Sequence, residues 1–240
     1  MLSDLSVVCW KWTPPAGYRS TYGPETVNTL ARMVRRHYPD PHRFICCTDN
    51  ADGLDKGVEV VPIWNDHADL PHPHSHIHPS CYRRLKAFSP DVKEFFGERF
   101  VSLDLDCVIV DDVRPLWNRK EKFVGWGGTT QPTNASYNGS MFLMTAGARP
   151  RVWKDFNPRF SPGIAKNAGF YGSDQAWMSY ILGPDEARWS TADGVYSYRL
   201  HVATCHGRLP RNARIVFFNG KKDPWTPEIA GLPWIKEHWQ

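Results

Sequence analysis

The sequence predicts one α/β domain with a mixed, mainly parallel central sheet flanked by helices. Short apolar runs rich in β-branched residues, typical of buried strands, alternate with amphipathic helical segments. Polar and aromatic residues directly follow several of these runs, where ligands of parallel sheets bind. We find no linker, internal repeat or low-complexity tract, and 41% of the 240 residues are hydrophobic. We therefore expect a single domain over residues 1–240.

The first half supplies most of the predicted parallel strands. Residues 6–10 form the first apolar run, and residues 43–48 and 58–64 form the next two. A helix is expected over 24–38, because it opens with a proline and its apolar residues recur at helical spacing, as Val27, Leu30, Met33 and Val34.

The second half continues the same alternation. Residues 82–96 are expected to be helical with a break near Pro90, and residues 99–110 form the strongest strand of the chain. Strands around a glycine-rich loop (122–147), a short helix behind Gly172 and Ser173, and a last strand (213–220) follow.

Charge and cysteine content narrow the class of protein. The net charge of +4 is compatible with a polyanionic partner but does not require one. No apolar run approaches the roughly 20 residues of a membrane span, and the first residues lack the pattern of a signal peptide. The six cysteines show no CxxC spacing. We expect a cytoplasmic protein with reduced thiols and no membrane span.

Two carboxylates interrupt the strongest predicted strand. Alternation places Asp104 and Asp106 on the same face, where they repel each other and lose hydration. A hard divalent cation would relieve this repulsion and could also hold a substrate diphosphate. Alternatively, one aspartate caps a turn and the other pairs with an arginine.

Several motifs surround this pair in a specific order. A Y-x-R-L segment precedes it, a D-hydrophobic-x-x-L element follows it, and N-G-S, D-Q and F-F-N-G-K-K-D-P-W elements come later in the chain. Their residues are Tyr82, Arg84 and Leu85, then Asp112, Val113 and Leu116, then Asn138, Asp174, Gln175 and Phe217 to Trp225. Together these motifs resemble the GT-A glycosyltransferases of the glycogenin and bacterial galactosyltransferase type.

This resemblance implies a Rossmann-like GT-A domain with a nucleotide-binding half over about 1–113 and an acceptor half over about 114–240. The expected activity is that of a hexosyltransferase, which moves a hexose from a UDP-sugar to a hydroxyl acceptor with Mn²⁺ or Mg²⁺ and with retention of configuration. Two alternatives stay open: a Mg²⁺-dependent nucleotidyl- or phosphotransferase, for which a third acidic residue near the metal is expected, and a non-catalytic nucleotide-sugar-binding module.

The resemblance also implies roles for individual residues. Asp104 and Asp106 would bind the metal, and Asp174 and Gln175 would contact the transferred sugar as catalytic residues. The family's third metal ligand is not kept in this sequence, and Asn219, the nearest oxygen donor, is expected as a further ligand. Residues expected to bind the donor are Cys9, Trp10, Lys11, Thr48, Asp49, Arg84, Asp104, Leu105, Asn138, Lys221 and Lys222. Trp10 either stacks on the base or packs in the core.

Two positions depart from the family pattern. Phe217 stands where the family has a metal-binding histidine, and Asp223 stands where it has a lysine. Lys221 and Lys222, just upstream, supply the phosphate-binding charge or form a solvated basic turn.

Two further features bear on the acceptor, which the motifs do not identify. The first is PHPHSHIHP, whose His72, His74, His76 and His78 share one face of an extended chain. This segment is a solvated loop, an acceptor-binding element or a Zn²⁺ or Ni²⁺ site.

The second feature is a set of basic residues interleaved with aromatic residues, as nucleic-acid acceptors require. Its members are Arg149, Arg151, Arg159, Arg208, Arg211 and Arg214. They suit a hydroxymethylated DNA base, or they are ordinary surface charge beside a glycan or small-molecule acceptor.

Overall fold

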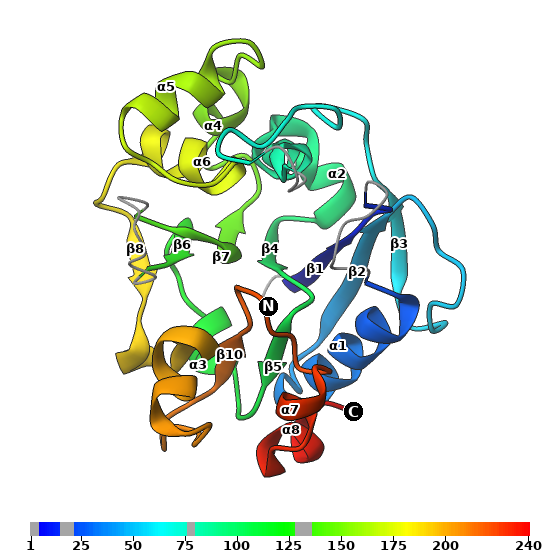
Figure 1. Cartoon of the computed structure of the whole chain (residues 1–240). Helices are drawn as coiled ribbons and strands as arrows, with labels where there is room; N and C mark the ends of the chain where they lie inside the picture. Colours follow the sequence, from blue (N-terminus) through cyan, green and yellow to red (C-terminus); the bar gives the residue numbers. More distant parts are fainter. Residues whose placement is uncertain (1–4, 15–21, 76–79, 128–135) are drawn as a thin grey trace.

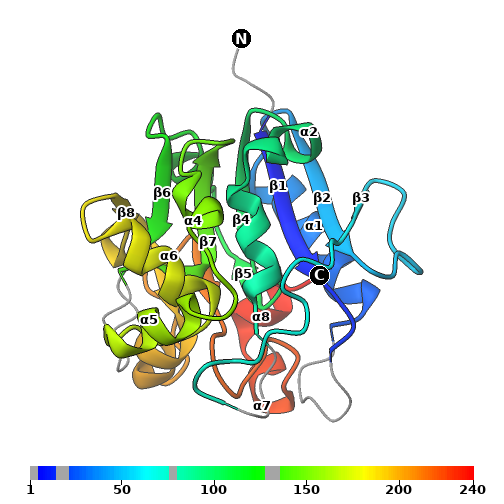
Figure 2. The same cartoon turned by 90° about the horizontal axis from the view of Figure 1, so that it is seen from above.

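The computed structural model describes residues 5–14, 22–75, 80–127 and 136–240. Within these residues a seven-stranded sheet in the order β3-β2-β1-β4-β7-β6-β8 crosses the molecule, and helices cover both faces (Figures 1 and 2). Its strands all run in the same direction except β7, which is antiparallel to β4 and β6. The mainly parallel α/β fold is thus confirmed. The strands are β1 Leu5–Lys11, β2 His42–Thr48, β3 Glu59–Pro62, β4 Arg99–Leu103, β6 Phe123–Trp126, β7 Asn138–Thr145 and β8 Ala187–Trp189.

A smaller sheet lies beside the large one in the order β5-β10-β9, with β5 Cys107–Ile109, β10 Ile215–Phe217 and β9 Val195–Ser197. The prediction of a single strand over 99–110 is therefore wrong. The amide of Asp104 still donates to Ser140 O of β7 (2.9 Å), whereas Asp106 O accepts from the amide of Phe218, directly after β10 (2.8 Å). The chain bends between these two bonds as it passes from one sheet to the other.

One face of the large sheet is covered by α1 Pro24–His37, α3 Arg114–Trp117, α7 Pro227–Ala230, α8 Pro233–His238 and the small sheet (Figure 1). The predicted apolar stripe of α1 is buried in this core. Proline occupies the first turn of α1, where its missing N–H costs nothing.

The other face is covered by helical segments from both halves of the chain (Figure 1). The break expected near Pro90 is confirmed, since three short segments replace one helix there. The segments on this face are η1 Tyr82–Phe88, η2 Pro90–Val92, α2 Lys93–Phe96, α4 Arg151–Lys154, α5 Ser161–Asn167 and α6 Asp174–Leu182. The chain also forms η3 Thr191–Asp193, η4 Tyr198–Val202 and η5 Ala203–Cys205.

In the described part of the chain, the helices are all too short or too polar to cross a membrane.

Candidate active site

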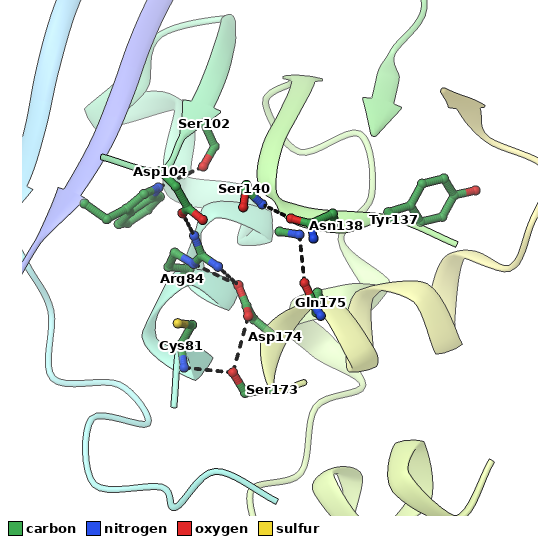
Figure 3. A network of polar contacts seen from close by, with 12 residues as sticks. Cys81, Arg84, Ser102, Asp104, Tyr137, Asn138, Ser140, Ser173, Asp174 and Gln175 are labelled. Carbon is green, nitrogen blue, oxygen red and sulfur yellow. Dashed lines mark hydrogen bonds and ion pairs between the residues drawn. The ribbon is translucent and has the colours of Figure 1, made fainter. Parts of the chain in front are cut away.

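The candidate site lies where β1, β2 and β4 end and where β7 and α6 begin (Figure 3). Because β7 is antiparallel to β4, its first residues lie beside the last residues of β4. The amide of Asp104 thus bonds Ser140 O at this edge, in the region where open α/β sheets bind their ligands.

Arg84 joins three of the predicted motifs. Its Nε donates to Asp174 Oδ2 (2.8 Å), its Nη2 lies 2.7 Å from the same oxygen, and its Nη1 donates to Asp104 Oδ1 (Figure 3). Arg84 is only 7% exposed. The Y-x-R-L segment, the D-x-D turn and the D-Q helix therefore meet through one buried guanidinium.

The ionisation of this network follows from its geometry. Burial alone would lower the pKa of Arg84, but Asp174 and Asp104 outweigh it and raise this pKa well above its usual value. Burial raises the pKa of Asp174, and the nearby guanidinium opposes that shift. Arg84 therefore stays charged and stabilises two carboxylates that the core would otherwise disfavour.

The D-Q pair is held by contacts on both sides. Ser173 Oγ accepts a hydrogen bond from the amide of Cys81 (2.9 Å) and donates to Asp174 Oδ1 (3.4 Å). Gln175 Oε1 accepts from the amide of Gly139 (3.2 Å). The first turn of α6 is thus tied to η1 and to β7, and Gln175 has a fixed orientation at the edge of the site (Figure 3).

Asp106 differs from Asp104. Within the described residues, its carboxylate has no hydrogen bond or ion pair with another residue. Burial raises its pKa well above the usual value, and the charges of Asp104 and Asp223 raise it further. A partly buried carboxylate beside two others is stabilised by a proton or by a bound cation that neutralises it.

Among the described residues, no side chain clearly provides the expected third metal ligand. Phe217 is fully buried and stacks on Trp126 with the ring centroids 4.5 Å apart, so this position contributes no ligand. Asn219 Oδ1 already accepts a hydrogen bond from Ser197 Oγ (2.7 Å). Among the described residues, no three His, Cys, Asp or Glu side chains are arranged to hold a metal. Ligation by Asn219 remains a prediction.

The ends of β1 and β2, where a nucleoside site is predicted, lie side by side. Lys11 and Thr48 are paired in register and both donate to Asn50 O, at 2.9 and 2.8 Å. The carboxylate of Asp49 accepts from the amide of Thr13 (2.9 Å) and so holds the chain that leaves β1. These residues form a polar edge next to the carboxylates.

Three of the residues predicted to bind the nucleotide-sugar donor have buried side chains. Cys9 is fully buried beside Cys46, and Leu105 is 2% exposed. Trp10 is 5% exposed, its Nε1 donates to Ser102 Oγ (2.8 Å), and its ring meets two other aromatic rings edge-on. This arrangement is the core-packing alternative for Trp10. The side chains of all three residues are part of the apolar cores next to the site.

The remaining residues predicted to bind the nucleotide-sugar donor lie at the rim of the candidate site. Asn138 Oδ1 accepts from the amide of Ser140 (2.8 Å), which shapes the start of β7. Lys221 and Lys222 are both exposed, and Lys222 forms an ion pair with Glu228 (3.3 Å). Their phosphate-binding role remains a prediction.

Sequence reasoning missed three residues of this site. Ser173 was seen only as the residue before the D-Q helix, and Gly139 only as part of a strand. Asp223 was identified as a departure from the family pattern, but its proximity to Asp106 depends on how the last segment folds back. A buried serine or glycine beside a catalytic motif carries no signal of its own in a single sequence.

Comparison with solved structures identifies the fold. A crystal structure of the galactosyltransferase LgtC with donor and acceptor sugar analogues matches with a TM-score of 0.65 and 14% identity, over 97% of this chain and 94% of that chain. The glycosyltransferase GlyE of Streptococcus pneumoniae matches with a TM-score of 0.58 and 11% identity, over 98% of this chain and 63% of that chain. The bifunctional glycosyltransferase WbbM matches with a TM-score of 0.58 and 14% identity, over 99% of this chain and 51% of that chain.

The chain therefore has the GT-A glycosyltransferase fold, and the predicted resemblance is confirmed at the level of fold. At sequence level neither a protein-family model nor a curated protein matches. Structural likeness at this identity establishes architecture, so activity must be argued from the site itself.

Proposed function

We propose that this protein is a glycosyltransferase that moves a hexose from a nucleotide-sugar, with a UDP-hexose as the donor, to a hydroxyl acceptor with retention of configuration. The observation that carries this proposal is the fork of Arg84, which joins Asp104 to Asp174. Arg84 thus brings together Asp104, which would face the diphosphate, and Asp174, which would face the transferred sugar. The fold shared with three glycosyltransferases supports the same conclusion.

The oxygen ligands available at this site suit Mn²⁺ or Mg²⁺. Asp104 and Asp106 would hold the ion through hard oxygen ligands, and the raised pKa of Asp106 reflects a partly desolvated charge, repelled by its neighbours, that a cation would neutralise. When bound, the ion would neutralise charge on the diphosphate leaving group. Asn219 would complete the protein ligands, and Lys221 and Lys222 would add positive charge at the phosphates.

Asp174 and Gln175 would bind the hydroxyls of the transferred hexose. Both side chains are held before substrate arrives, since Arg84 binds Asp174 and Gly139 binds Gln175. Such preorganisation lets hydrogen bonds act on the transition state without reorganisation. Lys11, Thr48 and Asp49 would line the nucleoside end of the same crevice.

One observation favours a second function. Asp223 is the third carboxylate near Asp106 that we expect of a Mg²⁺-dependent nucleotidyl- or phosphotransferase. Against it, the D-Q pair lies in the site, where a nucleotidyl- or phosphotransferase has no need of it. We therefore favour glycosyl transfer.

The test is donor turnover. The protein is incubated with a panel of UDP-, GDP- and dTDP-hexoses and Mn²⁺ or Mg²⁺, and nucleoside diphosphate release is measured with and without candidate acceptors. We expect release from at least one UDP-hexose. Asp106→Ala should lower it by about a hundredfold or more, a loss typical of removing a charge-stabilising group, with an unchanged circular dichroism spectrum.

Other outcomes identify the alternatives. Pyrophosphate release from a nucleoside triphosphate would indicate a nucleotidyltransferase. Nucleotide-sugar binding without any release would indicate a binding module. Undiminished turnover in Asp106→Ala would show that the D-x-D turn does not act in the reaction.

A further inference from the structure

The histidine-rich segment contains none of the residues proposed to bind the donor, yet its described part contacts the chain that leads into α6. Lys166 Nζ donates to Pro73 O (2.8 Å), and His74 Nε2 lies 3.2 Å from Phe170 O. These bonds attach the segment to α5 and to the connection between α5 and α6. His76 and His78 lie outside the described residues, so only His72 and His74 enter this argument.

These two histidines form an aromatic cluster with Tyr171. The rings of His74 and Tyr171 are stacked, with centroids 4.4 Å apart and planes at 30°. His72 meets both rings at steep angles, with centroids 6.0 Å from His74 and 6.2 Å from Tyr171. Tyr171 nevertheless remains 41% exposed. A large ring held in place and still exposed is a ready contact surface for a ligand.

This cluster lies next to the sugar end of the site. Tyr171 stands three residues before Asp174, so its Cα is within about 11 Å of that residue even if the chain between them is fully extended. Tyr171 O also accepts a hydrogen bond from Gln175 Nε2 (3.2 Å). A ligand on Tyr171 would therefore approach the hexose from the side of α6.

The chemistry of the cluster fits a sugar ring. The faces of Tyr and His rings offer apolar surface for the C–H groups of a pyranose, while the phenol and imidazole edges can hydrogen-bond its hydroxyls. A nucleic-acid acceptor would require available positive charge. Here two of the arginines that suggested a nucleic acid are already paired with carboxylates, Arg149 with Glu186 and Arg151 with Asp155.

We propose that Tyr171, His74 and His72 form the acceptor subsite and that it takes a pyranose ring of a saccharide. This inference rests on the proposed glycosyl transfer, and it assigns a role to the histidine-rich segment that donor binding leaves open.

The first experiment measures saccharide binding directly, without donor or metal. Saturation-transfer NMR is recorded with methyl glycosides of glucose, galactose and mannose, and with maltose and lactose. We expect at least one of them to receive saturation from the wild-type protein. The signal should be lost in Tyr171→Ala and kept in Tyr171→Phe, which retains the ring.

The matched control is Tyr180→Ala. Tyr180 is also 41% exposed and stacks on Trp177, but it lies near the far end of α6. This variant should bind saccharides like the wild type. Equal loss in Tyr180→Ala and Tyr171→Ala would overturn the proposal, as would the absence of binding by every saccharide in the panel.

The second experiment uses turnover with the saccharide that binds best. Tyr171→Ala and His74→Ala should raise the acceptor KM by about tenfold, the loss of one aromatic contact, and raise the donor KM by less than about threefold. Stimulation by an oligonucleotide with hydroxymethylated bases, and by no saccharide, would overturn the subsite. A wild-type protein that binds saccharides but releases no diphosphate from any donor would contradict the proposed function and leave the subsite supported.

Discussion

At the scale of single residues, Arg84 organises the site because it alone, among the described cations, contacts both Asp104 and Asp174. An arginine suits this position, since its rigid planar fork bonds two acceptors at once and it stays charged when buried. The carboxylates that it does not neutralise, above all Asp106, are the part of the site that a metal and substrate would complete.

The first prediction concerns Asp106→Asn. Since the folded state raises the pKa of Asp106, it binds a proton more tightly than the unfolded chain, so this group costs stability as the pH rises above about 4. At pH 8 without metal, the variant should be more stable by about 1–2 kcal/mol, which raises Tm by roughly 2–8 °C. At pH 4 or below, the difference should disappear.

The measurement is thermal unfolding in EDTA and then in Mn²⁺. Mn²⁺ should raise the Tm of the wild type but not that of Asp106→Asn, because the carboxylate ligand is gone. Asp52→Asn is the control, since Asp52 is exposed and is not one of the proposed metal ligands. Equal stability of wild type and Asp106→Asn at pH 8 would contradict the assignment of a buried, repelled charge.

At the scale of elements, the site depends on a strand that ends early. The predicted strand over 99–110 divides into β4 and β5, and Asp104 and Asp106 lie in the turn between them. The apolar pattern continues across the turn because both strands and Leu105 are buried. Periodicity therefore could not locate the break, which is decided by the hydrogen bonds to β7 and to the residue after β10.

The second prediction concerns the start of β7. A Cβ at Gly139 would lie 2.8 Å from Nη2 of Arg84 and 3.4 Å from Oδ2 of Asp174. The end of an arginine can usually move away, but this one is held by two carboxylates. Gly139→Ala should therefore destabilise the protein by about 1–3 kcal/mol and lower turnover by about tenfold or more, since both motifs shift.

Urea unfolding and donor turnover check this prediction. The control is Gly163→Ala within α5, where no atom lies within 4 Å of the added Cβ. It should be neutral or stabilise by about 0.5–1 kcal/mol, because alanine favours a helix more than glycine does. If Gly139→Ala unfolds at the same urea concentration as the wild type, the close packing around Arg84 is not as described.

At the scale of the whole molecule, two apolar cores on opposite faces of one sheet hold the site between them. Cys9, Cys46 and Cys107 lie in one core and Cys47 in the other, all fully buried, whereas Cys205 is exposed. All six cysteines are free thiols. Cys81 is partly buried, and its burial raises the pKa of its thiol to about 12, which disfavours the reactive thiolate.

The third prediction follows from this distribution. A thiol reagent at pH 8 should modify Cys205 rapidly and the four buried thiols only at the rate of global unfolding. Cys205→Ser should remove the fast phase without changing stability, and denaturant should expose the other five. Rapid modification of Cys9, Cys46, Cys47 or Cys107 in the wild type would mean that one of the cores opens locally.

The fold class, most of the elements and the order of the motifs can be predicted from the sequence without the structure. Hydrophobic spacing and proline positions are local signals, which is why α1, β1, β2 and the break near Pro90 could be predicted. That the D-x-D and D-Q motifs belong to one site is implied only by the family resemblance.

The assembly of the site, by contrast, depends on long-range contacts that appear only in the folded chain. Contacts such as Arg84 with Asp174, Asp223 near Asp106 and His74 on Tyr171 join residues far apart in the chain. They depend on sheet order, on the turn after β4 and on the return of the last segment to the small sheet. The burial of Trp10 was decided in the same way, because a tryptophan at a strand end packs or binds according to which helix covers it.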